Sequence, residues 1–306
     1  IPRPPRSTRK ESSAASDVYK RQNISSNVVL NTVYKDAIIN REKMLSILKG
    51  PKFEQILQKA RGNWNEFTPT KEEGTTAGID SSFNNTKFQG IELWATTAVS
   101  IKTDGEVLVD LHDSGLGSDI DLSRIASKME IDACEKTVDE VDLVLMDGSL
   151  HSQFMTRQSA LDAQVVRTMN KKKNVIFIAK TSNTKKQFEN LGSLAGDIFY
   201  YNHITNGPGF SEVFVEKNYG LDKIISSTFV RLSDSTPIIK LEFLGGKHDN
   251  DEVKSIMNKL FKTSVGGYPY SLKLAHNNCK ISDKELGKMV SLLGLSNEIG
   301  SREVLG

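Results

Sequence analysis

Three acidic residues lie where the chain can bring them together at one edge of a sheet. Asp80 ends a predicted strand within Gly78–Ser82 (GIDSS), Asp147 ends another within Leu145–Ser149 (LMDGS), and Glu130 lies on the predicted helix between them. A carboxylate at a buried strand end is costly unless it is paired, hydrogen-bonded or bound to a metal ion. Such hard oxygen ligands suit Mg²⁺ or Mn²⁺, which can activate water and stabilise an in-line phosphodiester displacement.

The same acids allow a plainer interpretation. An acid before Gly-Ser is often a turn former or a helix N-cap, and turn chemistry would account for Asp80 or Asp147 taken alone. Glu130 has acidic neighbours at Asp132 and Glu135, as a solvated helix residue often has. Spacing alone therefore does not select a catalytic trio.

Other residues of the chain can act on phosphates or protons. Lys180 follows the apolar strand Val175–Ala179 and can contact a phosphate as a point charge, although an ordinary solvated lysine fits the position equally well. The basic run Lys171–Lys173 is better explained as a solvated loop, although it too can contact phosphate. In Gly266–His276 (GGYPYSLKLAH), glycines and a proline fix a turn before a helical pattern. His276 can shuttle protons or bind metal there, or it can simply pack or cap.

The elements that would position these residues follow from hydrophobic periodicity. Ala77–Asp80, Phe88–Ile101 and Glu106–Leu111 predict three successive antiparallel strands, and Asp119–Val138 has the apolar stripe of a helix. Further strands are predicted over Asp142–Met146, Asn174–Ala179, Ser211–Glu216, Ser227–Leu232 and Pro237–Phe243. Further helices are predicted over Thr156–Met169, Thr184–Leu191, Asp251–Lys262 and Asp283–Leu293. Strand hairpins followed by helix–strand alternation predict an α/β fold in which helices flank a mixed sheet.

Helical spacing also precedes this core. Val28–Leu48 and Phe53–Phe67 both show it, and Gly50-Pro51 marks a break between them. The sequence therefore predicts an N-terminal helical arm over residues 23–70, ahead of a core with its C-terminal motif over residues 75–295.

The composition sets the class of protein. A chain of 306 residues, 25% of them charged, can form a sizeable core, and none of its apolar runs approaches the roughly 18 residues of a membrane helix. The two cysteines, Cys134 and Cys279, lie in neither a CxxC nor a Cys/His zinc spacing. We therefore expect a soluble protein of the reducing cytoplasm, without a zinc site, a disulfide framework or a membrane span.

The first 22 residues differ from the rest. Ile1–Gln22 is polar, proline-rich and without periodicity, and Asp17–Gln22 (DVYKRQ) matches one reading frame of a transposon-end sequencing adaptor. We interpret residues 1–22 as a non-native, disordered segment rather than a natural basic tail. The segment carries six basic and two acidic residues, so removing its net +4 from the chain's +2 leaves −2. Net charge then gives no general argument for nucleic-acid binding, and DNA contacts must come from local basic clusters.

Taken together, the motifs resemble those of the NurA nucleases. The resemblance covers about residues 75–290 and rests on the order and spacing of several motifs rather than on one. The motifs are Gly78–Ser82, Leu145–Leu150, Ile178–Ser182, Tyr268–Tyr270 and Ala275–His276. By match of motif, the resemblance implies four metal-holding residues, Asp80, Glu130, Asp147 and His276. It implies that Tyr268, His276 and, more weakly, Lys180 complete the catalytic site.

The resemblance also implies a fold, an activity and partners. The fold would be similar to RNase H and the Piwi nuclease domain, with Mn²⁺- or Mg²⁺-dependent cleavage of DNA. The protein would be a homodimer that works with a hexameric HerA-type translocase ATPase on single- and double-stranded DNA ends. Its activity would be that of a 5′-to-3′ exonuclease and single-strand endonuclease in DNA end resection and double-strand break repair.

Two details of the match need comment. The helix acid of the family falls best on Glu130, seventeen positions before Asp147, and Glu135 is a less favoured substitute. Ser81 departs from the pattern, because we expect glycine after the first aspartate in this family. Serine occupies many turns, so this departure weakens the first motif without breaking it.

Hypotheses from other classes remain beside the nuclease. A non-catalytic DNA-end or translocase adaptor could keep the same fold, although retention of all four predicted metal-holding residues favours the enzyme. A serine hydrolase that uses Ser149 is disfavoured because the chain has no GxSxG motif. A P-loop NTPase is disfavoured because the chain has no Walker A motif.

Overall fold

The chain forms two compact units, Ile1–Glu54 and Gln55–Gly306. The segment interpreted as adaptor-derived, Ile1–Gln22, lies outside the residues that the structure describes. This computed structural model describes residues 30–155, 159–220, 222–246 and 248–298 of the 306-residue chain.

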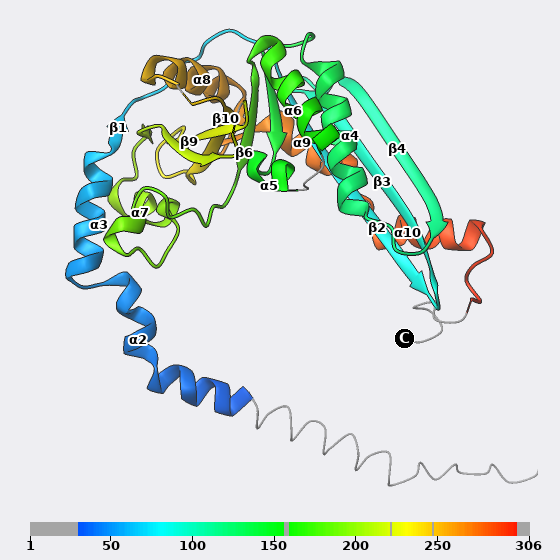
Figure 1. Cartoon of the computed structure of the whole chain (residues 1–306), viewed down its shortest axis with the longest axis horizontal. Coiled ribbons are helices and arrows are strands. Elements are labelled where there is room, and N and C mark those ends of the chain that lie inside the picture. Colours follow the sequence, from blue (N-terminus) through cyan, green and yellow to red (C-terminus); the bar gives the residue numbers. More distant parts are fainter. Residues whose placement is uncertain (1–29, 156–158, 221, 247, 299–306) are drawn as a thin grey trace, which may run out of the picture. The chain divides into compact units, whose positions relative to one another are not determined.

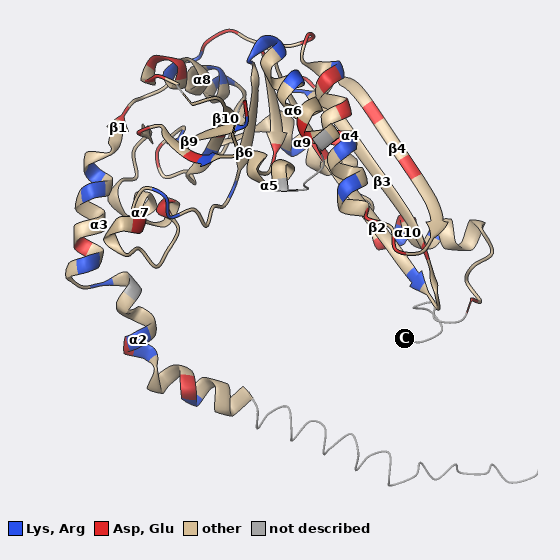
Figure 2. Cartoon of the chain, in the orientation of Figure 1, with Lys and Arg blue, Asp and Glu red and all other residues tan. Residues whose placement is uncertain are grey.

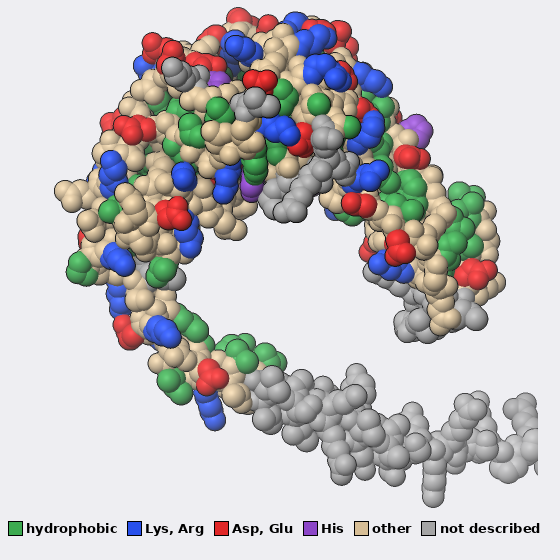
Figure 3. Space-filling model, viewed as in Figure 1, with side chains coloured by type: hydrophobic (Ala, Val, Ile, Leu, Met, Phe, Trp, Pro, Cys, Tyr) green, Lys and Arg blue, Asp and Glu red, His purple; other side chains and the backbone are tan. Residues whose placement is uncertain are grey.

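The described part of the first unit is mainly helical. Residues 30–39 form a helix, followed by α2 (Arg41–Leu45) and the 3-10 turn η1 (Ser46–Leu48), as the helical spacing predicts. Many of its apolar side chains are exposed, and Figure 3 shows such side chains on the surface of this unit. The large exposed ones are Leu30, Val33, Tyr34, Ile38, Ile39, Met44 and Leu48. The predicted apolar stripe is therefore a surface feature of these helices.

The second unit contains the central sheet and the helices on its two faces. Its strands are β1 (Trp64–Glu66), β2 (Thr76–Phe88), β3 (Ile91–Lys102), β4 (Val107–Gly117), β5 (Leu143–Asp147), β6 (Val175–Ala179), β7 (Gly209–Ser211), β8 (Phe214–Asn218), β9 (Ile224–Arg231), β10 (Ile239–Leu244), β11 (Ser264–Val265) and β12 (Tyr268–Pro269). Its helices, from α3 at the unit boundary onward, are α3 (Pro51–Gly62), α4 (Leu122–Thr137), α5 (Leu150–Met155), α6 (Ser159–Lys172), η2 (Glu189–Leu191), α7 (Asp197–Ile204), α8 (Asn250–Thr263), α9 (Tyr270–Cys279) and α10 (Asp283–Leu292).

The strand order of the sheet identifies the fold. In the order β4-β3-β2-β5-β6, strand β3 runs antiparallel to both of its neighbours, whereas β2, β5 and β6 run parallel. A three-stranded meander whose first strand is followed by two parallel strands is the arrangement of the RNase H-like fold. The predicted mixed α/β sheet is therefore confirmed (Figure 1). The sheet continues through β10, β9, β7 and β1, and β8 also pairs with β9.

Helices cover both faces of the sheet, and alternate strand residues divide between them. In β5, Val144 and Met146 pack in a core with residues of α4, α5 and α6. Leu143 and Leu145 of the same strand pack on the other face, in a core with residues of α8 and α9. These two faces are called the α4 face and the α9 face below.

Four predicted elements differ from the structure. Helix α3 ends at Gly62, and strand β1 follows it, so the helical arm predicted over residues 23–70 contains a strand of the sheet. The predicted helix Thr184–Leu191 contains the short turn η2, and α7 begins later, at Asp197. The predicted strand Ser211–Glu216 is split between β7 and β8. Strand β2 runs on to Phe88 because β3 pairs with it along its whole length. In each case, pairing or packing with distant residues overrides the local pattern.

Charged side chains are spread over many elements of the chain, and Figure 2 shows basic and acidic residues together on α3 and α4. In the basic run, Lys171 and Lys172 both form ion pairs with Asp139. This run precedes β6, at the opposite end of that strand from Lys180. Lys171 and Lys172 lie in the last turn of α6, so the loop predicted for this run is wrong for these two residues, whose charges are paired at the surface. Within the described ranges, no helix has both the length and the apolar character needed to cross a bilayer.

Candidate metal centre

Asp80 and Asp147 lie side by side where two parallel strands diverge. Strand β2 pairs with β5 so that Gly78 is opposite Leu145, and the two aspartates follow two positions further on in the same register. Because side chains alternate along a strand, both aspartates share the face of Leu145, which packs in the core of the α9 face. The strand ends predicted from the sequence therefore bring these two acids together.

Helix α9 reaches the aspartates because β2 has a glycine where the helix begins. A Cβ atom on Gly78 would lie 2.4 Å from the backbone nitrogen of Leu272 and 2.4 Å from the carbonyl carbon of Ser271. The backbone of α9 thus rests directly on β2. His276 follows Leu272 by about one helical turn, and this spacing brings it to Asp80.

Replacing Gly78 with alanine should destabilise the protein by about 3 kcal/mol, because the new methyl group meets backbone atoms that cannot move without shifting α9. Urea unfolding would measure the change. Gly287→Ala in α10 is the matched control, since a Cβ atom there meets nothing within 4 Å. That change should stabilise the helix by up to about 1 kcal/mol. Equal unfolding midpoints for Gly78→Ala and the wild type would contradict the close packing of α9 on β2.

A glycine turn sets Tyr268 in place. Strands β11 and β12 pair antiparallel across Gly266 and Gly267, whose φ angles of 63° and 78° favour glycine. Tyr268 begins β12 and donates its hydroxyl hydrogen to Asp147 Oδ1 at 3.1 Å. The C-terminal motif therefore brings both Tyr268 and His276 to the two aspartates.

The two aspartates, His276, Lys180 and Tyr268 form one polar cluster. His276 Nδ1 lies 2.8 Å from Asp80 Oδ2, and Lys180 Nζ lies 3.0 Å from Asp147 Oδ2. Lys180 Nζ also lies 4.8 Å from the centre of the Tyr268 ring, within cation–π range. One ligand atom from each of Asp80, Asp147 and His276 lies within 4.8 Å of the other two. Two carboxylates and an imidazole at this spacing can share a divalent cation.

The electrostatics of the cluster also fit a bound cation. Asp80 is 8% exposed, and its burial, followed by the charge of Asp147, raises the pKa of Asp80. Burial and then the charge of Asp147 also raise the pKa of Tyr268, so its hydroxyl remains a donor. A cation between the carboxylates would offset both their lost hydration and their repulsion. The donor set therefore fits a hard divalent ion such as Mn²⁺ or Mg²⁺.

The hydrogen bond between His276 and Asp80 constrains the histidine. An ionised carboxylate has no hydrogen to donate, so Nδ1 of His276 carries the hydrogen of this contact. Nε2 is then the nitrogen left for a metal ion or a proton, on a side chain that is 57% exposed. Carboxylate contacts of this kind orient many metal-binding histidines.

Glu130 approaches the cluster from the opposite side of the sheet. Its helix, α4, packs on the face of Ala77 and Ile79. Ser81, two residues after Ile79, donates its hydroxyl hydrogen to Glu130 Oε1 at 2.5 Å, and its backbone N–H donates to Asp80 Oδ1 at 2.8 Å. One serine therefore links the two acids. The group of close ligand atoms found among the described residues contains Asp80, Asp147 and His276 but not Glu130.

The electrostatic environment of Glu130 nevertheless connects it to the cluster. Burial raises the pKa of Glu130 to about 7, and the charges of Asp80 and Asp147 contribute to the rise. Hydrogen bonds from Ser81 and from Gln153, whose Nε2 donates to Glu130 Oε2 at 3.0 Å, oppose it. Glu130 is therefore linked to the aspartates through Ser81 and through their charges, and its role as a ligand stays a prediction.

The alternative helix acid, Glu135, has other partners. It accepts hydrogen bonds from Gln164 Nε2 at 2.9 Å and from Arg167 at 3.3 Å. These partners lie on α6, whereas Glu130 contacts β2 and α5. The structure therefore favours Glu130 over Glu135 as the helix acid of the cluster.

Sequence reasoning missed two polar side chains of the site. Ser81 was noted only as a departure from the family pattern, yet it holds both Asp80 and Glu130. Its alternation with Ala77 and Ile79 could have placed it on the α4 face. No local signal marks Gln153, because its contact with Glu130 joins α5 to α4 across the fold.

Comparisons with known proteins relate the chain to one family. The NurA domain family model matches residues 74–281 of the chain. The DNA double-strand break repair nuclease NurA of Saccharolobus solfataricus is 24% identical, over 79% of this chain and 87% of that protein. The relative of the same name from Sulfurisphaera tokodaii is 22% identical, over 84% of this chain and 92% of that protein.

Solved structures share the fold. The crystal structure of the NurA nuclease from Sulfolobus solfataricus has a TM-score of 0.72 at 18% identity and covers 86% of this chain and 96% of that one. A crystal structure of NurA with manganese has a TM-score of 0.60 at 12% identity and covers 86% and 99%. Since the family match spans all of β2 to α9 and both aspartates, the chain belongs to the NurA family.

Proposed function

We propose that this chain is a divalent-metal-dependent deoxyribonuclease that hydrolyses phosphodiester bonds. The observation that carries the proposal is the meeting of Asp80, Asp147 and His276, with ligand atoms within 4.8 Å of one another. The names of the relatives support the substrate, because they are DNA double-strand break repair nucleases. The structures named as NurA with manganese and as NurA bound to dAMP and manganese support the type of cofactor.

Each residue of the cluster has a proposed role. Asp80, Asp147 and His276 would hold the ion, and Glu130 would complete the metal-holding set from the α4 face. When bound, Mn²⁺ or Mg²⁺ supplies Lewis-acid stabilisation of the phosphate oxygens. Tyr268 fixes the orientation of Asp147 through its hydroxyl.

Lys180 and His276 would serve the substrate more directly. Lys180 is half exposed and holds its charge beside Asp147, where a phosphate can replace the carboxylate as its partner. The exposed His276 side chain can hold or pass a proton through Nε2. Both roles use side chains at the surface of the cluster, where DNA can reach them.

The biological setting is part of the proposal. The chain would act as a 5′-to-3′ exonuclease and single-strand endonuclease in DNA end resection during double-strand break repair. It would work in the cytoplasm as a homodimer with a HerA-type hexameric translocase. The two free, buried cysteines, Cys134 and Cys279, are compatible with a reducing compartment.

Removal of divalent metal should abolish cleavage. The carboxylates of the cluster cannot by themselves supply the positive charge that a phosphodiester displacement needs. Cleavage of end-labelled DNA should therefore stop in EDTA and return on addition of Mn²⁺ or Mg²⁺. Robust cutting in EDTA would remove the metal mechanism.

The alternative function is a non-catalytic adaptor that binds DNA ends for the translocase. It predicts binding of DNA ends without cleavage under every ion condition, with or without the translocase. The same assay separates the two functions, because an enzyme of the proposed kind cuts once the ion is restored.

A further inference from the structure

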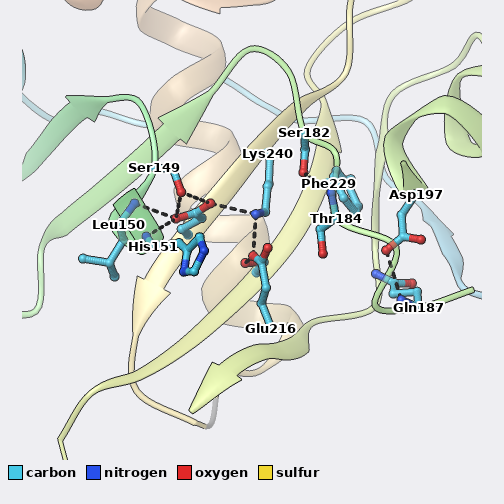
Figure 4. A network of polar contacts seen from close by, with 12 residues as sticks. Ser149, Leu150, His151, Ser182, Thr184, Gln187, Asp197, Glu216, Phe229 and Lys240 are labelled. Carbon is cyan, nitrogen blue, oxygen red and sulfur yellow. Dashed lines mark hydrogen bonds and ion pairs between the residues drawn. The ribbon is translucent and has the colours of Figure 1, made fainter. Parts of the chain in front are cut away.

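A chain of buried charges lies beneath the turn that follows Asp147. Lys240 and Glu242 of β10 are 3% and 0% exposed, and Glu216 of β8 is 7% exposed. Lys240 Nζ forms ion pairs with both carboxylates, at 2.7 Å to Glu242 Oε1 and in closer contact with Glu216 (Figure 4). Burial of three charges costs free energy that hydrophobic residues would not cost. The arrangement therefore calls for an explanation beyond stability.

The Glu242 carboxylate contacts the start of α5 and the residue before it. Its Oε2 accepts hydrogen bonds from the backbone N–H of Leu150 at 2.6 Å and of His151 at 3.4 Å. The Ser149 hydroxyl also donates to this carboxylate, at 3.0 and 3.1 Å. Glu242 thus holds three consecutive residues that begin two positions after Asp147.

The held segment is joined to Asp147 through Gly148 alone. Gly148 turns the chain with a φ of 100°, and its N–H donates to the carbonyl of Ile178 in β6 at 3.0 Å. On one side, Asp147 is fixed by pairing of β5 with its neighbours. On the other side, the turn is fixed by Glu242. Loss of the contacts with Glu242 would let the end of β5 shift while the rest of the sheet stays paired.

An ion pair with Lys240 keeps Glu242 in this position, and Glu216 pairs with the same ammonium group. Lys240 and Glu242 are two residues apart in β10 and so share a face. Although burial opposes ionisation of Glu216, the Lys240 ammonium lowers the pKa of Glu216. A hydroxyl hydrogen bond from Ser227 to Glu216 at 2.6 Å fixes the far end of the chain of charges.

We propose that Glu242 is a positioning residue for the metal centre: it holds the 149–151 turn so that Asp147 faces Asp80 and His276. Lys240 supports Glu242 through an ion pair and forms a second ion pair with Glu216. The inference rests on the proposed function, because it takes Asp147 as a metal ligand. Glu242 itself touches neither the ion nor the substrate.

The test compares Glu242→Ala, the conservative Glu242→Gln and Ser149→Ala. In the metal-free protein, exchange of the Leu150 and His151 amide hydrogens should be at least about tenfold faster in Glu242→Ala, because both amides lose their acceptor. Binding of Mn²⁺ should weaken by about tenfold. Glu242→Gln, which keeps an acceptor oxygen, should recover part of both effects. Ser149→Ala removes a single hydroxyl, so it should raise amide exchange and weaken Mn²⁺ binding by less than Glu242→Ala does. This variant keeps the test decisive even if the Glu242 variants fold poorly.

Glu216→Gln is the matched control. It breaks the buried ion pair on the other side of Lys240, so it should lower the melting temperature but leave Mn²⁺ affinity and the exchange of Leu150 unchanged. Equal losses of Mn²⁺ affinity in Glu216→Gln and Glu242→Ala would overturn the positioning role, since both would then reflect general destabilisation. Unchanged exchange and affinity in Ser149→Ala and in every folded Glu242 variant would overturn it as well.

Asp147→Asn separates this inference from the proposed function. If Asp147→Asn binds Mn²⁺ as the wild type does, Asp147 is no ligand and the proposed metal centre fails. If Asp147→Asn loses Mn²⁺ while Glu242→Ala keeps full affinity, the metal centre stands and the positioning role is wrong. If both variants lose affinity and Glu216→Gln does not, both proposals are supported.

Discussion

Asp80→Asn should lower the rate of DNA cleavage by on the order of a thousandfold or more, while binding of DNA persists. Asparagine keeps the shape of the side chain but removes one ligand charge. The ligand atoms of Asp80, Asp147 and His276 lie within 4.8 Å of one another. DNA binding should survive or tighten, because one negative charge near the phosphates is lost. Cleavage of end-labelled DNA with Mn²⁺ and a binding titration on the same variant measure the two effects.

Asp113→Asn is the matched control for this change. Asp113 of β4 accepts a hydrogen bond from the backbone N–H of the following serine at 2.8 Å, as Asp80 does, but it is exposed and outside the cluster. Its replacement should leave cleavage unchanged. The metal-free Asp80→Asn protein should be as stable as the wild type, because the change removes a buried carboxylate that the charge of Asp147 opposes. Wild-type cleavage by Asp80→Asn would rule out the metal centre described here.

The strand-end acids could be predicted from the sequence because their positions are local. An apolar run that ends in an aspartate marks both Asp80 and Asp147, and parallel strands leave such residues at one edge of the sheet. Alternation within each strand then sets the face. The turn at Gly266-Gly267 is similarly local, but the contacts of Tyr268 with Asp147 and of His276 with Asp80 join residues far apart in the sequence. Only the resemblance to the NurA motifs implied that these two residues belong to the site.

The buried ion pairs of Lys240 with Glu242 and Glu216 could not be predicted in this way. Ile239–Phe243 (IKLEF) alternates apolar and charged residues, which indicates a strand with Lys240 and Glu242 facing water. The structure buries both, because β8 supplies Glu216 and the start of α5 supplies backbone donors. These partners are separated in sequence by tens of residues, so the pattern within β10 contains no information about them. The departures at β1 and α7 have the same origin.

Glu130→Gln should lower the cleavage rate by about a hundredfold, a smaller loss than that of Asp80→Asn. Glu130 reaches the cluster from the α4 face through Ser81 and lies outside the tight group of three, so its loss leaves the two aspartates and His276 in place. Glutamine keeps one oxygen that can accept from Ser81, but it removes the charge and the second acceptor oxygen, which Gln153 contacts in the wild type. Cleavage rates at saturating Mn²⁺, together with the Mn²⁺ concentration for half-maximal rate, measure how far Glu130 contributes to holding the ion.

Two variants make this prediction specific. Glu135→Gln, on the same helix, should leave cleavage unchanged because Glu135 is engaged with Gln164 and Arg167. Ser81→Ala should cost less than Glu130→Gln, since it removes one hydroxyl that orients Glu130 but no charge. Wild-type cleavage by Glu130→Gln would leave Asp80, Asp147 and His276 as the complete metal centre. A large loss of cleavage in Glu135→Gln would instead identify Glu135, about one and a half turns further along α4, as the helix acid. Helix α4 would then have to pack differently against the cluster.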